Sequence, residues 1–280
     1  MKTFNTVKEL TDSAEFTGGG AFVCRMPFGE YRKAPVISQS QVKDFLRSPA
    51  LYEARLTQPI EATTAMILGS YFDACITGDE FEKFGVRKHD GRTKEGKAEL
   101  ELMKGLGMLP VSAEDAEQVS RWVESFKSHP IYKTIAKAEF QVCGFAMIDG
   151  VRVKGRADAL IFDGSDLKIF DLKLVADGSP GKFAREIAEG YDIQAAMYSI
   201  IFADALKALT CTFRFLCQEK HPFKPTPKFT GDYDIFDTYL AHAKDVLRDA
   251  LKSIDLFTKM GSFAGYPTET IVPRFPRGSI

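Results

Sequence analysis

The feature that most constrains the fold is a switch to β-strand patterning between positions 139 and 175. Asp149-Gly150 divides two runs of this pattern, and such a dipeptide is a strong signal for a two-residue β-hairpin. The turn Asp163-Gly164-Ser165-Asp166 divides the second run from a third. The sequence therefore predicts three consecutive antiparallel strands at residues 139–148, 151–162 and 167–175.

Helical patterns surround these strands, and a further strand is expected at 210–217. Residues 15–35 are rich in glycine and the end of the chain is rich in proline, so both are expected to be irregular. Strands in one block with helices on either side are typical of an α/β or α+β fold with one mixed sheet. We expect helices at 38–47, 49–55, 62–76, 93–104, 112–128, 180–209 with a break at Gly190, and 232–259. We expect one domain over residues 1–280, with a helical part at 36–136, a sheet core at 137–217 and a C-terminal helix and tail at 231–280.

The composition argues against several classes of protein. The net charge of the 280 residues is −1, so a protein that coats nucleic acid through its overall charge is not expected. The five cysteines include no Cys-x-x-Cys pair, which argues against zinc and iron–sulfur sites and favours free buried thiols. No apolar run reaches the roughly 20 residues of a membrane span, and no signal-peptide pattern begins the chain. We therefore expect a cytoplasmic protein without a membrane partner.

The tripeptide Asp171-Leu172-Lys173 is one of three acid-x-Lys matches in the chain, a number that chance alone explains. The hairpin register distinguishes among them. With the turn centred after Gly164, Asp158 faces Asp171 across the two strands, and Lys173 lies on the same face. The tripeptide Asp166-Leu167-Lys168 instead begins in the turn. A site around Asp158, Asp171 and Lys173 is therefore expected.

The preceding hairpin adds two polar residues to this face of the sheet. With Asp149-Gly150 as its loop, Gln141 faces Asp158, and Glu139 lies diagonally beside it. Glu139 is therefore a further candidate catalytic residue.

Two carboxylates that oppose each other within a sheet repel and destabilise the fold, and a bound cation reverses this effect. Hard oxygen ligands at this spacing suit Mg²⁺, with Mn²⁺ as a possible substitute. Lys173 could then orient or deprotonate a water molecule, or stabilise charge that develops on a phosphate. The alternative is an exposed polar face with incidental acids. Residues 169–175 are apolar on both faces, as in a central strand, and this favours the metal site.

Two further segments could contact a nucleic acid. Gln194 and Tyr198 lie one helical turn apart, so their shared face could hold a phosphate or a terminal nucleotide, or be a surface stripe. Residues 87–97 contain five Lys or Arg residues and two acids, a composition that is usually a solvated loop but is also the best candidate for backbone contact in this chain. The candidate DNA-binding residues are Arg87, Lys88, Arg92, Lys94, Lys97, Lys182 and Arg185.

These residues resemble the motifs of the PD-(D/E)xK nucleases, and more closely those of the RecE or exonuclease VIII type of phage exonuclease and its RecB-like relatives. The resemblance spans about residues 36 to 275. The three core motifs are Gly155-Arg156-Ala157-Asp158, Asp171-Leu172-Lys173 and Gln194-Ala195-Ala196-Met197-Tyr198. Further similarities lie in Ser38 through Leu56, in Arg92-Thr93-Lys94-Glu95-Gly96-Lys97, and in Gly265-Tyr266 with Pro273.

The resemblance implies a restriction-endonuclease-like α/β core, with a mixed central sheet flanked by helices. It implies Mg²⁺ held by Asp158, Asp171 and the carbonyl oxygen of Leu172, with Lys173 serving the attacking water. Gln194 and Tyr198 are the matching residues of the third motif. One feature departs from the family, whose Gly-x-x-x-His helix supplies a histidine to the metal: the corresponding stretch is Gly69-Ser70-Tyr71-Phe72-Asp73. Asp73 could replace that ligand or merely lie at the polar edge of its helix.

The implied activity is 5′→3′ exonuclease digestion of linear double-stranded DNA in phage-type homologous recombination by single-strand annealing. The implied setting is a bacterial or phage-infected cell, with an annealing protein and further copies of the chain in a ring as partners. One alternative is a related nuclease of repair or defence that acts on nicks or single strands. Another is a non-catalytic module that binds DNA ends, which the intact set of Asp158, Asp171 and Lys173 disfavours.

Overall fold

The computed structural model describes residues 1–58, 62–220 and 230–266. Its main sheet has the order β1-β2-β6-β7-β8-β9-β10, with β3 paired to β7 beside this path. The strands are β1 (Lys2–Thr3), β2 (Phe22–Arg25), β3 (Ile37–Ser38), β6 (Glu139–Ile148), β7 (Val151–Phe162), β8 (Asp166–Val175), β9 (Thr210–Glu219) and β10 (Thr230–Asp234). The antiparallel hairpins β6–β7 and β7–β8 and the parallel pair β8–β9 confirm the predicted mixed sheet.

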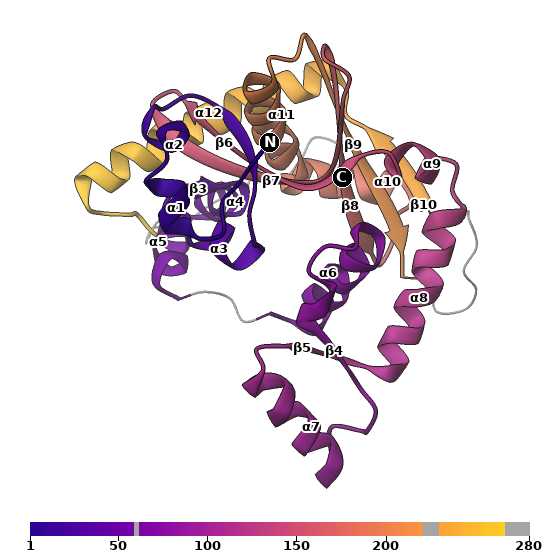
Figure 1. The fold of residues 1–280 in the computed structure, drawn as a ribbon. Coiled ribbons are helices and arrows are strands. Elements are labelled where there is room, and N and C mark those ends of the chain that lie inside the picture. Colours follow the sequence, from indigo (N-terminus) through magenta and orange to yellow (C-terminus); the bar gives the residue numbers. More distant parts are fainter. Residues whose placement is uncertain (59–61, 221–229, 267–280) are drawn as a thin grey trace, which may run out of the picture.

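Helices cover both faces of this sheet (Figure 1). One face packs against α4 (Gln39–Arg47), α11 (Asp192–Leu206) and α12 (Asp237–Met260), and the other against α6 (Thr64–Thr77) and α8 (Ala113–Ser128). Residues 193–199 of α11 are all buried, because this helix lies between the sheet and α12. The remaining helices of the main body are α1 (Val7–Thr11), α2 (Ala14–Thr17), α3 (Phe28–Lys33), α5 (Pro49–Thr57), α9 (Tyr132–Ile135) and α10 (Pro180–Glu186). None of the described helices is both long enough and apolar enough to span a membrane.

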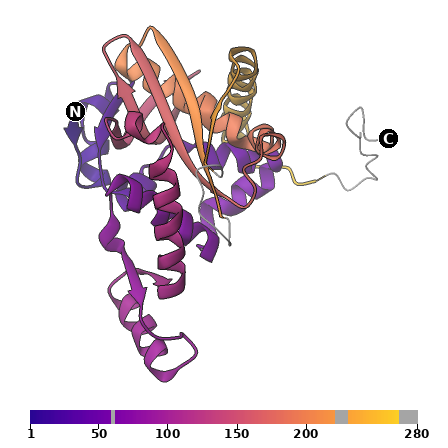
Figure 2. The same ribbon diagram turned by 90° about the vertical axis from the view of Figure 1, so that its right-hand side faces the viewer.

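Residues 84–112, called the arm below, project from the main body (Figures 1 and 2). The arm contains β4 (Phe84–Arg87), α7 (Lys94–Gly105) and β5 (Leu109–Ser112), and β4 and β5 form a separate parallel two-stranded sheet. The Thr93 side chain caps α7 by accepting a hydrogen bond from the backbone N–H of Gly96, with 3.0 Å between the two atoms. A Cβ atom at Gly96 would lie only 1.9 Å from the carbonyl oxygen of Asp90, so this turn requires glycine.

Two predictions about the ends of the chain are wrong. Residues 15–35 are not irregular, because β2 pairs with β6 and α3 follows it. The expected helix at 232–259 begins only at Asp237, because residues 230–234 form the edge strand β10 on β9. Pro273 and most of the proline-rich tail lie outside the described residues.

Lys154 on β7 ties α3 to the sheet. Its side chain is almost fully buried, and Nζ donates hydrogen bonds to the carbonyl oxygens of Tyr31, Arg32 and Ala34 at 2.9, 3.0 and 2.8 Å. These carbonyls lie at the end of α3, where two of them also accept a backbone hydrogen bond, Tyr31 O from the Ala34 N–H at 3.2 Å and Ala34 O from the Val36 N–H at 2.8 Å. Burial lowers the pKa of Lys154 to about 8, so the ammonium group remains charged at neutral pH.

Lys154→Met is expected to lower the free energy of unfolding by about 3 kcal/mol, because three carbonyl oxygens at the end of α3 lose a charged hydrogen-bond donor, and only two of them keep a backbone donor. Urea or thermal denaturation measures this loss, and Lys33→Met provides the matched control. Lys33 lies on α3 with its Nζ 2.5 Å from Glu30 in an exposed ion pair, which contributes little. Equal stability of the two variants would contradict the role assigned to Lys154.

Candidate active site

The site forms where β7 and β8 part. The two strands are paired from Phe162↔Leu167 to Ala159↔Phe170, and the next pair in this register would be Asp158 and Asp171. Farther back, β7 pairs with β3 at Val153 and Lys154 instead. Because the strands part, the backbone N–H of Leu172 has no backbone partner on β7. It donates instead to the side-chain Oδ2 of Asp158, at 2.8 Å. The predicted opposition of Asp158 and Asp171 is therefore present at the end of the β7–β8 ladder.

Asp171 is held by two side chains from the same face of the sheet. Its side chain is 3% exposed and forms an ion pair with Lys173. Gln194 on α11 donates from Nε2 to Asp171 Oδ1 at 2.5 Å and accepts from Lys173 Nζ at 3.3 Å. The side chains of Asp171, Lys173 and Gln194 thus form a closed triangle, which links the second and third sequence motifs.

The carboxylates of the site are close together and shielded from water, and both effects disfavour their charged forms. Burial and the neighbouring Asp171 raise the pKa of Asp158 to about 7. Burial opposes the charged form of Lys173, but Asp171 and Asp158 outweigh it and raise the pKa of this lysine above its ordinary value. Lys173 is therefore a protonated hydrogen-bond donor, suited to orienting a water molecule or stabilising a phosphate, rather than a base.

Asp73 on α6 belongs to the same cluster. Burial, followed by the charges of Asp158 and Asp171, raises its pKa well above the ordinary value, and Lys173 opposes this shift. Helix α6 packs against both β7 and β8, which places Asp73 at the site from the opposite side to Gln194. Three carboxylates from three elements therefore face one region of the sheet.

These carboxylates fit a divalent cation in chemistry and charge. Within residues 1–58, 62–220 and 230–266, no three His, Cys, Asp or Glu side chains converge as ligands of one ion. The mutual repulsion of Asp73, Asp158 and Asp171 is nevertheless the condition that a cation relieves, and carboxylate oxygens are the donors that hard divalent ions prefer. The residues that would hold the ion are these three and the carbonyl oxygen of Leu172. Such an ion would polarise a phosphate and lower the pKa of a water molecule.

Tyr198, one turn after Gln194, is buried near Asp171 and Asp158. Its ring packs against the sheet at Gly155, where a Cβ atom would lie 2.8 Å from the ring. The Tyr198 hydroxyl group bonds to the backbone of Arg156, and burial raises its pKa. Gly155 of the first motif is therefore glycine because the Tyr198 ring of the third motif leaves no room for a Cβ atom. These contacts of Tyr198 are with the sheet and its backbone.

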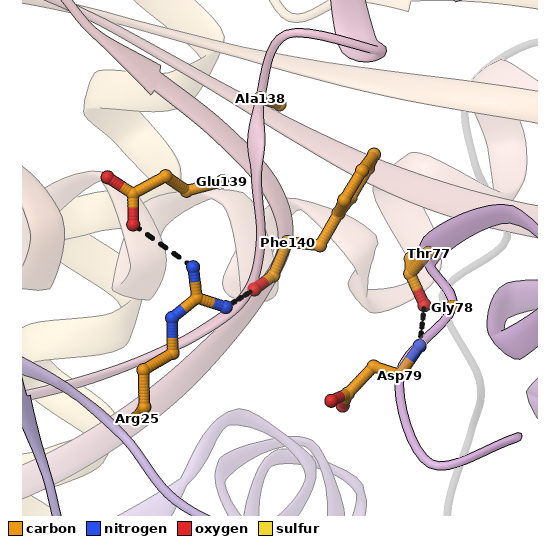
Figure 3. A pocket seen from close by; sticks show the side chains of 7 residues that line it. All are labelled: Arg25, Thr77, Gly78, Asp79, Ala138, Glu139 and Phe140. Carbon is orange, nitrogen blue, oxygen red and sulfur yellow. Dashed lines mark hydrogen bonds and ion pairs between the residues drawn. The ribbon is translucent and has the colours of Figure 1, made fainter.

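Glu139 lies outside this cluster of carboxylates. Figure 3 shows it in a shallow cavity of about 340 Å³, with the Arg25 guanidinium between Glu139 and the carbonyl oxygen of Phe140. The Arg25 Nη2–Glu139 Oε2 distance is 3.0 Å. The Glu139 side chain is 58% exposed, and the structure does not bring it to Asp171.

The predicted direct facing of Gln141 and Asp158 is also not formed as a regular pair. Gln141 has a φ of 55°, and the ladder between β6 and β7 omits this position. On either side of it, Phe140 and Val142 pack into opposite cores, although regular alternation would place them together. The alternation of side chains between the two faces of the sheet therefore shifts by one residue at the level of Asp158.

The basic residues of segment 87–97 lie on the arm. Arg92 is almost fully exposed and its Nε lies 3.6 Å from Asp90 Oδ1, while Lys88, Lys94 and Lys97 form no ion pair with any described residue. Lys182 and Arg185 lie on α10 in the main body, where Lys182 Nζ is 3.4 Å from Glu186 Oε1. The two groups of predicted DNA-binding residues are thus on separate parts of the molecule (Figure 1).

Sequence comparison identifies the family. Residues 38–259 match the family described as "PDDEXK-like domain of unknown function (DUF3799)". The chain belongs to this family. The PDDEXK-like domain is a nuclease fold whose members generally use divalent metal ions, which agrees with the carboxylates described above. No curated protein sequence matches the chain significantly.

A solved structure shares the fold of this PDDEXK-like domain. A crystal structure from Eubacterium rectale, described as a "putative exonuclease", aligns with a TM-score of 0.62 and 19% identity over 88% of this chain and 94% of that one. The alignment confirms the restriction-endonuclease-like core. A second structure, of SSO0001, has a TM-score of 0.30 and 15% identity over 57% of this chain and 68% of that one, a likeness too low to carry an argument.

One residue of the site has no signal in the local sequence. Lys43 on α4 lies against Tyr191, whose ring also contacts Lys173. Lys43 occupies a helix position that sequence reasoning treats as ordinary surface. Its burial depends on a segment almost 150 residues later, which no local pattern reveals.

Proposed function

We propose that the chain is a Mg²⁺-dependent 5′→3′ exonuclease that degrades linear double-stranded DNA, working as one nuclease domain over residues 1–280. The observation that carries the proposal is the triangle of Asp171, Lys173 and Gln194 beside the buried Asp158. This arrangement combines metal-binding oxygens with a protonated donor at the same end of the β7–β8 ladder. Hydrolysis of a phosphodiester needs both, because negative charge develops on the phosphate as water attacks.

The biological role is part of the same proposal. By its resemblance to RecE-type enzymes, the PDDEXK-like domain would prepare DNA ends for recombination by single-strand annealing. Its partners would then be an annealing protein and further copies of the chain in a ring, and Mn²⁺ would substitute for Mg²⁺. The 5′→3′ polarity rests on this resemblance alone, so the experiment must measure polarity directly.

Digestion of linear, nicked and covalently closed duplexes, labelled at either the 5′ or the 3′ end where an end exists, tests the proposal. With Mg²⁺ we expect rapid loss of the 5′ label from linear duplex and survival of closed circles, and with EDTA no cleavage. Rapid cutting of closed circles would replace the proposal with an endonuclease. Cleavage confined to nicks or single strands would indicate a repair or defence enzyme, and binding of ends without cleavage would indicate a non-catalytic module.

We also propose that the arm contacts the DNA backbone. Arg92→Ala combined with Lys94→Ala is expected to reduce the slope of log affinity against log salt by about two, because each lost phosphate contact removes roughly 0.9. Fluorescence anisotropy with a duplex in EDTA measures this slope. Lys259→Ala, which removes an exposed lysine from α12 in the main body, is the control. An unchanged slope in the double variant would make the basic segment an ordinary solvated loop.

A further inference from the structure

Lys43 is a partly buried cation without a charged partner. It lies on α4, beside the site but outside the catalytic triangle, and its Nζ is 5.6 Å from the centre of the Tyr191 ring. Among the described residues no carboxylate lies within ion-pair distance of Lys43 Nζ and no hydrogen bond to it is present. Burial and then the nearby Lys173 disfavour the ammonium form and lower the pKa of Lys43, and the charges of Asp171, Asp44 and Asp192 offset this only in part.

The backbone that covers Lys43 is irregular. Between α10 and α11 the chain kinks at residues Ile187–Tyr191, where Gly190 has a non-helical φ of 134°. A Cβ atom at Gly190 would lie 2.8 Å from Cδ of Lys43, so glycine is needed both for the backbone angle and for the close approach.

A cavity of about 180 Å³ opens at this point, lined by Lys43, Glu186, Glu189, Gly190 and Tyr191. It has room for several water molecules, each of which takes about 30 Å³ in the liquid. The two glutamates do not cancel the charge of Lys43: Lys182 is paired with Glu186, and Glu189 is exposed to water. Lys43 is thus the unpaired charge at the cavity next to the site.

The charges of the whole site point to an anion. Lys173 is paired with Asp171 inside the triangle, whereas the ammonium group of Lys43 has no ion-pair partner among the described residues. The Tyr191 ring contacts both lysines, with its centre 4.9 Å from Lys173 Nζ and 5.6 Å from Lys43 Nζ, so Lys43 lies beside the triangle, where a phosphate next to the reacting one could reach it.

We propose that Lys43 binds a backbone phosphate of the nucleic-acid substrate, next to the phosphate that is cut, in the cavity beside Gly190 and Tyr191. This inference rests on the proposed nuclease function and adds a substrate-binding residue to it. Lys43 positions the strand and takes no part in proton transfer. The contact is made in the bound and transition states alike, so it affects KM more than kcat.

The test compares wild type with Lys43→Met, which keeps the length of the side chain, and Lys43→Arg, which keeps the charge. Binding of a fluorescent duplex is measured in EDTA over a range of salt concentrations. For Lys43→Met we expect roughly tenfold weaker binding at low salt and a slope of log affinity against log salt lower by about 0.9, the value for one phosphate. Lys43→Arg should keep the wild-type slope, and so should the distant Lys259→Met control. In Mg²⁺, Lys43→Met should raise KM about tenfold with kcat changed less than threefold.

The melting temperature separates this role from a structural one. Removing an unpaired, partly buried charge should leave the melting temperature of Lys43→Met unchanged or higher. A wild-type salt slope in Lys43→Met, or a lower melting temperature with the slope unchanged, overturns the proposal while leaving the nuclease function intact. Wild-type protein that neither binds nor cleaves DNA refutes the nuclease function itself.

Discussion

Asp158→Asn is expected to abolish metal-dependent DNA cleavage while making the metal-free protein more stable. The loss of activity should be about 10³-fold or more, because the substitution removes a charged oxygen ligand from the place where charge must be stabilised. The gain in stability follows from the raised pKa of Asp158. The asparagine Oδ1 can still accept the hydrogen bond from the Leu172 N–H, so the local fold keeps its partner.

The stability effect depends on pH in a defined direction. In the folded protein Asp158 has a pKa of about 7, above its ordinary value of 3.8, so the fold disfavours its charged form. Below pH 4 the carboxyl group is neutral in both states and the two proteins should melt together. The penalty grows as the pH rises and is complete above pH 7. At pH 8 the variant should be more stable by on the order of 4 kcal/mol, because each pKa unit corresponds to about 1.4 kcal/mol, and its melting temperature should be higher by roughly 8–16 °C.

Asp171→Asn provides the matched comparison. This variant should also lose activity, but its free energy of unfolding should fall, whereas that of Asp158→Asn should rise. Its removal leaves the Lys173 ammonium, with a side chain 17% exposed, without its ion-pair partner. Breaking a buried pair in this way costs about 3 kcal/mol. Thermal melts in EDTA and cleavage assays in Mg²⁺ measure both properties. Near-normal cleavage by either variant would show that the site is elsewhere, and equal stability changes would contradict the electrostatic account.

Asp73→Ala is expected to reduce cleavage by about 10²-fold and to raise the Mg²⁺ or Mn²⁺ concentration needed for half-maximal activity. The reason is that Asp73 adds a third carboxylate to the region of Asp158 and Asp171, at a cost that a bound cation repays. Asp73→His should retain a working site, because a neutral imidazole can also bind the ion. A titration of the cleavage rate with each metal measures these effects.

The control lies on the same part of the chain. Asp79 follows the end of α6 and pairs with Arg156, with 2.5 Å between Oδ2 and Nη2. Asp79→Ala should change stability modestly and leave the metal requirement at its wild-type value. If Asp73→Ala shows wild-type rates with the same metal dependence, Asp73 only occupies the polar edge of its helix and the ligand assignment is wrong.

The long central strands and the opposition of Asp158 and Asp171 were predictable because each depends on residues close in sequence. The two hairpin turns set the register, and the register alone placed the carboxylates opposite each other. The missed strand β2 is four residues long and pairs with β6 about 120 residues later, so its local sequence contains too few positions to show alternation. Glycine near residues 18–20 then made the segment resemble a loop.

Side-chain environments were less predictable than strands. The expected position of Glu139 assumed regular alternation along β6, which the positive φ of Gln141 breaks. Gln194 was expected at the site on the strength of its motif, but its bond to Asp171 depends on the packing of α11 across the sheet. The burial of Lys43 depends on its contact with Gly190, which is far away in the sequence, and local periodicity does not reveal such a contact.

The arm has a consequence for how such proteins can diversify. Its two strands pair only with each other, so they share no ladder with the strands that carry Asp158 and Asp171. Only its base, at Phe84, Leu109 and Val111, contributes to the core between α6 and α8. Insertions, deletions or exchanges beyond that base leave the strand register of the main sheet untouched. The region from residue 87 to 108 is thus a module whose length and surface can change without disturbing the strands that carry Asp158 and Asp171.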